Sequence, residues 1–182
     1  DADKMKMKHY YYALASHVDD CAGQILRALD EGGKADNTIV IFTTDHGEFL
    51  GDHGRIQKGM PGHDCIVRVP FIVRYPARIP GRKTVDAIVE GVDFVPTILE
   101  FCGIEKPEIV QGKSLVPLIE GRESWIRDEA LIEYFTPEGN RSAALKTKEV
   151  MYYGDSQGNE ILYDRRKDPN EQVNVAGDVL YR

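Results

Sequence analysis

The sequence is poor in cysteine, and its few thiols are not arranged as a disulfide framework or a zinc site. Only three occur in 182 residues. Cys21, Cys65 and Cys102 are odd in number, far apart and set among apolar neighbours, which predicts buried free thiols. None has the basic or helix-start setting that activates a thiolate, so cysteine chemistry is not expected here.

Long apolar runs and clusters of basic residues are also missing. No apolar stretch has the length of a membrane span, and the net charge of −7 without a basic face argues against nucleic-acid binding. With 42% hydrophobic and 29% charged residues, the composition is that of a globular chain with one large domain, or one domain and an appendage. No signal peptide is recognisable, and the chain opens on Asp1 instead of an initiator Met. We therefore expect a fragment or a processed product.

The most informative segment is residues 37–58, which read NTIVIFTTDHGEFLGDHGRIQK. Thr38 to Phe42 form an apolar, β-branched run that predicts a strand over 38–43, buried on both faces of a parallel sheet. Asp45 and His46 follow directly. In open α/β sheets the carboxyl ends of strands are where ligand sites are built, so these two side chains are candidate metal ligands.

The loop after this strand carries more charge than a simple connection requires. Its ionisable side chains are Asp45, His46, Glu48, Asp52, His53 and Lys58. Charge beside a buried strand is costly unless it is paired or bound to a metal, and Gly47 and Gly51 allow the chain to turn tightly there. The pattern favours a metal site that processes an anion. The alternative is that Asp45 only starts a turn and His46 is a solvated loop residue.

Periodicity and turn residues predict the remaining elements. Apolar residues at spacings of three and four predict a helix over 5–31, ended by Gly32-Gly33, so that the strand at 38–43 completes half of a βαβ unit. Further along we expect a strand at 67–75, a short strand or turn at 85–89, a helix at 94–102 with Asp93 as its N-cap, and helical residues near 115–119. β-forming segments at 130–135, 143–153 and 160–163, separated by turns, predict an antiparallel meander.

Five segments together point to a known family. They are HVDDCAGQIL at 17–26, the block from Asp36 to Lys58, RVPFIVRYP at 68–76, VDFVPTILEFCG at 92–103 continued by QGKSLVPLIEG at 111–121, and ILYDRRKDPNEQVNVAG at 161–177. In these motifs and their order, the chain resembles the C-terminal part of a sulfatase of the alkaline-phosphatase-like superfamily. The resemblance implies an α/β fold. Residues 1–124 would be part of a sandwich with a mostly parallel sheet flanked by helices, and residues 125–182 a small α+β subdomain with an antiparallel sheet.

The resemblance also implies roles for residues of the loop. Asp45 and His46 match the pair that coordinates a divalent cation, most simply calcium, with manganese, magnesium or zinc open because of the imidazole. Lys58 matches the lysine that binds the sulfate group or the leaving oxygen, and is expected to be catalytic and substrate-binding. His53 is expected to support the site or to contact the substrate. Further candidates are His63 and Arg68, although Arg68 and Arg74 also fit a solvated or ion-paired strand edge.

One part of the family's active site is missing from these residues. Sulfatases and phosphonate hydrolases use a nucleophile in a C-x-P-x-R or S-x-P-x-R context, the cysteine being converted to formylglycine, and no cysteine here fits. The N-terminal aspartates that complete the metal shell are absent too. The resemblance thus implies half of an active site, which requires the N-terminal half of the domain and a formylglycine supplied there.

The resemblance implies that the parent protein is a metal-dependent sulfuric ester hydrolase acting on a small-molecule or carbohydrate sulfate ester. Two alternatives remain open: hydrolysis of phosphonate monoesters or phosphodiesters, and a non-catalytic module that keeps the fold. The resemblance favours a periplasmic or secreted protein.

Overall fold

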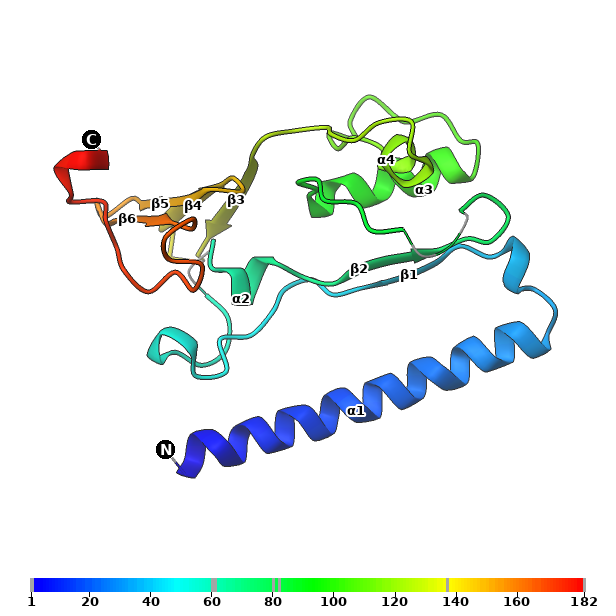
Figure 1. Cartoon of the computed structure of the whole chain (residues 1–182), viewed down its shortest axis with the longest axis horizontal. Coiled ribbons are helices and arrows are strands. Elements are labelled where there is room, and N and C mark those ends of the chain that lie inside the picture. Colours follow the sequence, from blue (N-terminus) through cyan, green and yellow to red (C-terminus); the bar gives the residue numbers. More distant parts are fainter. Residues whose placement is uncertain (1, 60–61, 80, 82, 137, 182) are drawn as a thin grey trace. The chain divides into compact units, whose positions relative to one another are not determined.

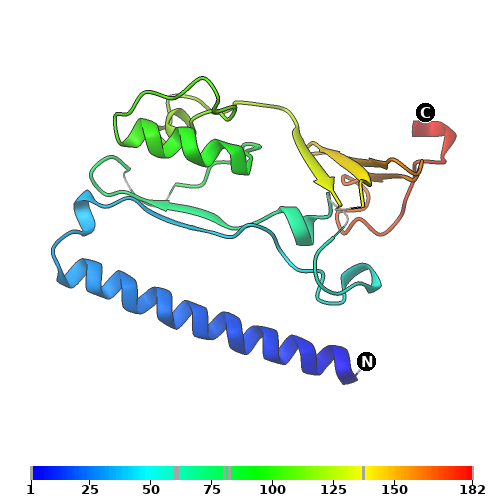
Figure 2. The same ribbon diagram turned by 180° about the vertical axis from the view of Figure 1, so that it is seen from behind.

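The computed structural model describes residues 2–59, 62–79, 81, 83–136 and 138–181 (Figures 1 and 2). The chain divides into two compact units. The first comprises Asp1–Lys58 and Val69–Gly81, and the second Gly59–Arg68 and Arg82–Arg182. The division into domains at residue 124 stays a prediction.

The first unit opens with a long helix, α1 (Ala2–Glu31), which confirms the helix predicted from apolar spacing. It ends where Gly33 adopts a left-handed φ of 65° and the N–H of Lys34 donates to the carbonyl of Leu29. No residue of α1 is buried. The apolar stripe therefore specified the helix, but its side chains have no core to enter within this unit.

The other elements of the first unit are η1 (Ala35–Asn37), β1 (Val40–Thr43), η2 (Asp52–Gly54) and β2 (Phe71–Arg74). β1 and β2 are antiparallel, with Val40 opposite Arg74 and Thr43 opposite Phe71. The strand predicted at 38–43 exists, but the prediction that it lies buried on both faces of a parallel sheet is wrong for the described residues. Phe42 is 47% exposed. An apolar, β-branched run specifies a strand without specifying the direction of its neighbour.

The second unit contains a short helix α2 (Asp64–Val67), η3 (Gly91–Asp93), α3 (Phe94–Phe101) and α4 (Val116–Glu120). α2 includes only the first residue, Val67, of the strand predicted at 67–75; residues 68–70 have no regular structure, and β2 begins at Phe71. Residues 85–89 form no strand. The helix predicted at 94–102 is confirmed, with Asp93 at its N-cap position as predicted. The Asp93 carboxylate makes no capping hydrogen bond to α3; it accepts the N–H groups of Glu90 and Lys113 and binds Arg127.

The predicted antiparallel meander is confirmed as a sheet of four strands in the order β3 (Ala130–Phe135), β4 (Arg141–Lys146), β5 (Val150–Asp155) and β6 (Glu160–Asp164). The chain then reaches η4 (Val179–Tyr181). The segment predicted at 143–153 is two strands, because the Thr147 hydroxyl accepts the N–H groups of Glu149 and Val150 and closes a turn between them. One face of the sheet holds a core of Ala144, Met151, Tyr153 and Tyr163.

The three cysteines are free, as predicted, but the prediction that they are buried is wrong for two of them. Cys21 and Cys102 are exposed and Cys65 is half-buried. Cys21 lies on α1, none of whose residues is buried, and Cys102 follows the last residue of α3. Apolar neighbours in sequence predicted burial, but neither position has a packing partner that would cover it.

Candidate functional site

The loop after β1 folds back on itself. The N–H of Phe49 donates to the carbonyl of Gln57 at 3.2 Å, and the N–H of Gly51 donates to the carbonyl of Arg55 at 2.8 Å. The reversal needs left-handed backbone, which the loop has at Leu50, Gly51, His53, Gly54 and Gln57. Gly51 adopts its φ of 100° without steric cost, because it has no Cβ. The two hydrogen bonds close residues 49–57 and bring the backbone of Lys58 beside Phe49, three residues from His46.

Asp45 and His46, the predicted metal ligands, are in contact at the beginning of this loop. The Asp45 carboxylate accepts the N–H of His46 at 3.0 Å and the Thr44 hydroxyl at 3.2 Å. The hydrogen bond from the His46 N–H is the largest influence on the carboxyl, and with the charge of the His46 ring it lowers the pKa of Asp45 despite some desolvation. Asp45 is therefore an ionised, hard oxygen donor at neutral pH.

The imidazole of His46 is oriented by its other nitrogen. Nδ1 lies 2.7 Å from the carbonyl oxygen of Gly47, which can only accept, so Nδ1 carries the hydrogen and donates it. In a neutral ring, Nε2 is then the nitrogen with the free lone pair, and it lies 3.4 Å from Oδ2 of Asp45. A hydrogen bond from Nδ1 to a carbonyl is the arrangement that fixes the tautomer of a metal-binding histidine.

These two side chains fit a divalent cation. Asp45 Oδ2 and His46 Nε2 lie 3.4 Å apart, and when the ring is neutral both atoms present lone pairs, so that a cation or a proton between them relieves their repulsion. In the described part of the chain no group of three or more histidine, cysteine, aspartate or glutamate residues could hold a metal ion. Asp45 and His46 therefore suit part of a coordination shell.

Two further candidates lie on the same loop. His53 is half-buried with φ of 52°, and its ring meets that of Phe49 edge to face, with centroids 6.0 Å apart. Phe49 is 2% exposed, so this packing holds the imidazole on the loop. Lys58 is exposed and forms no ion pair with any described residue. Glu48 is a structural member of the loop, since its carboxylate accepts the N–H of Leu50 at 3.1 Å.

The remaining candidates from the sequence have structural partners. His63 is buried in the second unit, where its ring packs edge to face on Tyr163 at 5.8 Å. Arg68 is paired with Asp64 at 3.6 Å, and Arg74 with Asp30 at 2.9 Å. For both arginines this is the ion-paired alternative predicted from the sequence.

The sequence did not draw attention to two lysines of α1. Lys4 and Lys8 lie near the loop at Gly51, where an added Cβ atom would lie 3.8 Å from Cδ of Lys4 and 3.9 Å from Cε of Lys8. Their spacing of four residues puts both on one face of the helix, but such a pair at the start of a helix usually indicates only a solvated surface. Contact with a loop distant in sequence is not encoded in that spacing.

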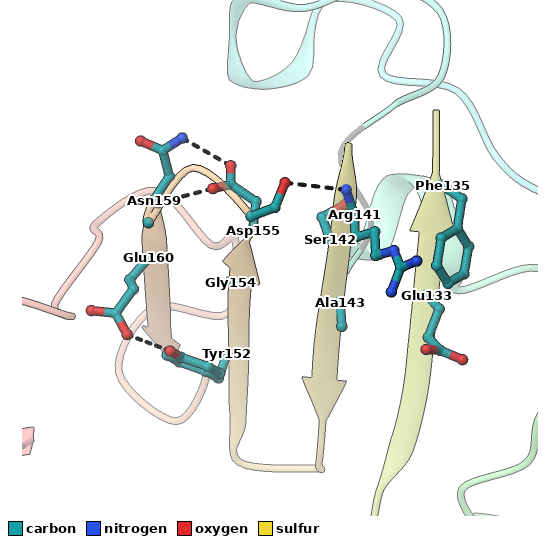
Figure 3. A pocket seen from close by; sticks show the side chains of 12 residues that line it. Glu133, Phe135, Arg141, Ser142, Ala143, Tyr152, Gly154, Asp155, Asn159 and Glu160 are labelled. Atoms are coloured by element: carbon teal, nitrogen blue, oxygen red, sulfur yellow. Dashed lines mark hydrogen bonds between the residues drawn. The ribbon is translucent and has the colours of Figure 1, made fainter. Parts of the chain in front are cut away.

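A cavity of about 440 Å³ lies elsewhere, on the four-stranded sheet (Figure 3). Acidic groups outnumber basic ones in its lining, where Glu133, Asp155 and Glu160 accompany Arg141. The Tyr152 hydroxyl donates to Glu160, and Asp155 accepts the side-chain amide of Asn159 at 2.8 Å. This cavity is poorly suited to an anionic ligand.

Comparison with known proteins identifies the family of the chain. A sequence model of the family described as N-sulphoglucosamine sulphohydrolase, C-terminal, matches residues 51–182, and one of a family of unknown function matches residues 4–90. An arylsulfatase of Clostridium perfringens is 36% identical over 180 residues, covering 97% of this chain and 37% of that protein.

Solved structures of related hydrolases also match the chain. One, described as a complex with its substrate D-glucosamine-2-N,6-O-disulfate, matches with a TM-score of 0.82 at 34% identity, covering 90% of this chain and 35% of the other. The phosphonate monoester hydrolase of Agrobacterium radiobacter matches with a TM-score of 0.82 at 32% identity, covering 91% of this chain and 36% of the other. The chain thus spans little more than a third of the length of these relatives, and its predicted alkaline-phosphatase-like fold class is confirmed. The chain belongs to the sulfatase family, whose C-terminal part it matches.

Proposed function

We propose that the protein carrying this chain is a metal-dependent sulfuric ester hydrolase, and that the loop after β1 supplies part of its active site. The observation that carries this proposal is the contact of the ionised Asp45 with Nε2 of His46, whose Nδ1 is held by the Gly47 carbonyl, in a chain of the sulfatase family. In this proposal Asp45 and His46 bind the cation, Lys58 binds the sulfate group, and His53 supports the loop or contacts the substrate.

The chemistry of sulfate ester cleavage suits these groups. The ester carries negative charge, and more develops on the leaving oxygen as the bond breaks, so fixed positive charge lowers the barrier. A bound cation supplies Lewis acidity to the sulfate oxygens. Lys58 adds an ammonium group with no ion-pair partner among the described residues, so its charge is available to the substrate. The hydrogen bond from the His46 N–H orients the Asp45 carboxylate, and the hydrogen bond from Nδ1 to the Gly47 carbonyl orients the His46 ring.

The identity of the cation and the nucleophile are part of the same proposal. The carboxylate of Asp45 is a hard donor that suits calcium, whereas the imidazole of His46 keeps manganese, magnesium and zinc as alternatives. No cysteine or serine in the sequence lies in a C-x-P-x-R or S-x-P-x-R context. A formylglycine nucleophile and the remaining metal ligands are therefore expected in the N-terminal half of the domain, which this chain requires for a complete site.

For the substrate we propose a sulfated saccharide or another small sulfate ester. The structural relative solved with D-glucosamine-2-N,6-O-disulfate supports the choice of a sulfated glucosamine as the first compound to assay. Within the described part of the chain, no helix is both long and apolar enough to cross a bilayer. A periplasmic or secreted location follows from family resemblance alone and is proposed on that basis.

A second candidate function is hydrolysis of phosphonate monoesters or phosphodiesters. The likeness to the phosphonate monoester hydrolase favours it, because a cation and an ammonium group serve a phosphonate as well as a sulfate. A non-catalytic module that keeps the fold is the alternative of a different class.

These functions are separated by assaying the complete protein with an aryl sulfate and a phenyl phosphonate monoester under identical conditions. We expect a higher kcat/KM for the sulfate, and a large loss of kcat for Lys58→Ala. The matched control is Lys34→Ala, an exposed lysine of the same unit. Preference for the phosphonate would establish the second function. Absence of both activities, in a protein whose nucleophile context is intact, would favour the module.

A further inference from the structure

Two lysines of α1 lie against the loop that carries the candidate site. Cδ of Lys4 and Cε of Lys8 come within 3.8 and 3.9 Å of the position that a Cβ of Gly51 would occupy. Both views show the start of α1 on the side of the loop after β1 (Figures 1 and 2), because α1 and β1 run in opposite directions. α1, β1 and the loop belong to one compact unit.

The aliphatic stems, rather than the charged ends, make this contact. Gly51 has no side chain, and the position that its Cβ would occupy lies at ordinary van der Waals distance from the two stems. The ammonium group of Lys8 is one bond beyond the contacting Cε, and that of Lys4 is two bonds beyond its Cδ. Long basic side chains commonly cover a surface with their stems while the charge extends past it.

The two charges are not neutralised by the described residues. Neither Lys4 nor Lys8 forms an ion pair there, although the exposed Asp52 follows Gly51 directly. Like charges one turn apart on a helix repel each other. Lys4 and Lys8 therefore repel each other on the face of α1 near the loop, and an anion bound between them would remove this repulsion.

The candidate site is near. Gly51 lies two residues from Phe49, a distance of at most about 7 Å along the chain. Phe49 is hydrogen-bonded to Gln57, the neighbour of Lys58. Lys4 and Lys8 thus lie near the loop at Gly51, and Lys58 directly follows the residue that closes it; only Lys58 was predicted from the sequence.

We propose that Lys4 and Lys8 bind a second sulfate group of a sulfated saccharide, while Lys58 binds the sulfate that is cleaved. This inference rests on the proposed function, and it deepens it by naming the substrate class: esters with at least two negative groups. The two lysines are specificity-determining residues that act on binding and leave the chemical step unchanged.

The test compares glucosamine 6-O-sulfate with glucosamine-2-N,6-O-disulfate as substrates of the complete protein. The double variant Lys4→Ala/Lys8→Ala is expected to raise KM for the disulfate roughly tenfold, with kcat and the constants for the monosulfate little changed. Lys4→Arg/Lys8→Arg should restore the low KM, because it keeps the charge. Lys6→Ala is the matched control, since Lys6 lies about 200° around the helix from Lys4 and therefore on another face.

Salt gives a second readout that a merely structural role would not move. The preference of the unaltered protein for the disulfate should fall as sodium chloride is raised, and that of the double variant should not. An equal change of KM for both substrates, or an equal effect of Lys6→Ala, would overturn the inference. If neither substrate is hydrolysed, the proposed function fails. Calorimetric binding of the disulfate then decides the inference alone: lysine-dependent affinity supports it and lysine-independent affinity overturns it.

Discussion

Lys146 on β4 is the cation of a buried ionic cluster, and replacing it by methionine is expected to destabilise the second unit strongly. Its ammonium group lies 2.7 Å from Oε1 of Glu171, 2.6 Å from Oδ1 of Asp64 and 2.5 Å from the carbonyl oxygen of Gly62. Glu171 is 2% exposed. Methionine keeps most of the volume of lysine but leaves two carboxylates and a carbonyl without their shared donor.

The magnitude follows from what remains. Removing one partner of a buried ion pair costs about 3–5 kcal/mol. Arg165 still contacts both carboxylates, at 2.8 Å from Asp64 and 3.3 Å from Glu171, and Asp64 is a quarter exposed. We therefore expect a loss near the lower limit, about 3 kcal/mol, or roughly a hundredfold in the equilibrium for local opening.

Amide hydrogen exchange of the complete protein measures this opening locally, in peptides from β4 and β5. The matched control is Lys148→Met, on the turn between these strands, whose ammonium group pairs with Asp86 at 2.8 Å while both side chains are exposed. Water screens that pair, so only a small effect is expected. Equal loss of protection in the two variants would refute the argument from burial.

The cluster also makes a prediction about pH. Burial alone would raise the pKa of Asp64, but the hydrogen bond and charge of Lys146, with the charge of Arg165, lower it below its usual value. A carboxyl with a lowered folded-state pKa contributes stability that is present above its unfolded pKa, near 4, and is lost as pH falls below it. Lys146→Met should flatten this acid-dependent loss. An unchanged pH profile would contradict the assignment.

Three other predictions concern a glycine, a buried aspartate and the isolated chain. Gly62→Ala should lower the free energy of unfolding by about 3 kcal/mol, because φ is 105° and the new Cβ would lie 2.8 Å from that of Ala144. The control Gly158→Ala, with φ of 83° and open space around it, should lower it by about 1 kcal/mol. Equal losses of the two variants in denaturant unfolding would exclude the packing effect. Burial raises the pKa of Asp93, but the hydrogen bonds from Arg127, Glu90 and Lys113 outweigh it and lower the pKa. The loss of stability of the α3 region below pH 4 should therefore be smaller in Asp93→Asn, and amide hydrogen exchange at varied pH measures it. The 182-residue chain alone should bind divalent cations weakly and lack sulfatase activity, because two ligands from one loop leave the remaining coordination to water; turnover of an aryl sulfate by the repurified chain would overturn this.

Local patterns predicted the regular elements well. The spacing of apolar residues located α1, and alternation with turn residues located β3 and β6, because both signals are contained in a few consecutive residues. The direction of β1 relative to its neighbour was not predictable in this way. This direction depends on the path of the chain between β1 and residues 71–74, and the apolar run at 38–42 carries no information about that path.

Ion pairs between residues distant in the sequence were not predicted. Asp93 was predicted as a helix cap from its neighbours, but its strongest partner is Arg127, 34 residues away. The ion pair of Lys146 with Asp64 joins residues 82 positions apart and has no sequence signature. In the candidate site, the β1 loop and the contact of Asp45 with His46 were predictable because they are adjacent. The approach of Lys8 to Gly51 was not, because it requires the packing of α1.

The central claim is that the loop after β1 belongs to a metal-dependent sulfatase site, and inorganic sulfate release by the complete protein tests it most directly. Sulfate released from glucosamine-2-N,6-O-disulfate is measured after chelation and after return of calcium, manganese, magnesium or zinc. We predict that chelation abolishes release, that one of these cations restores it, and that Asp45→Ala cannot be restored at the same cation concentration. Release that survives chelation, or that is equally rapid in Asp45→Ala, would contradict the claim.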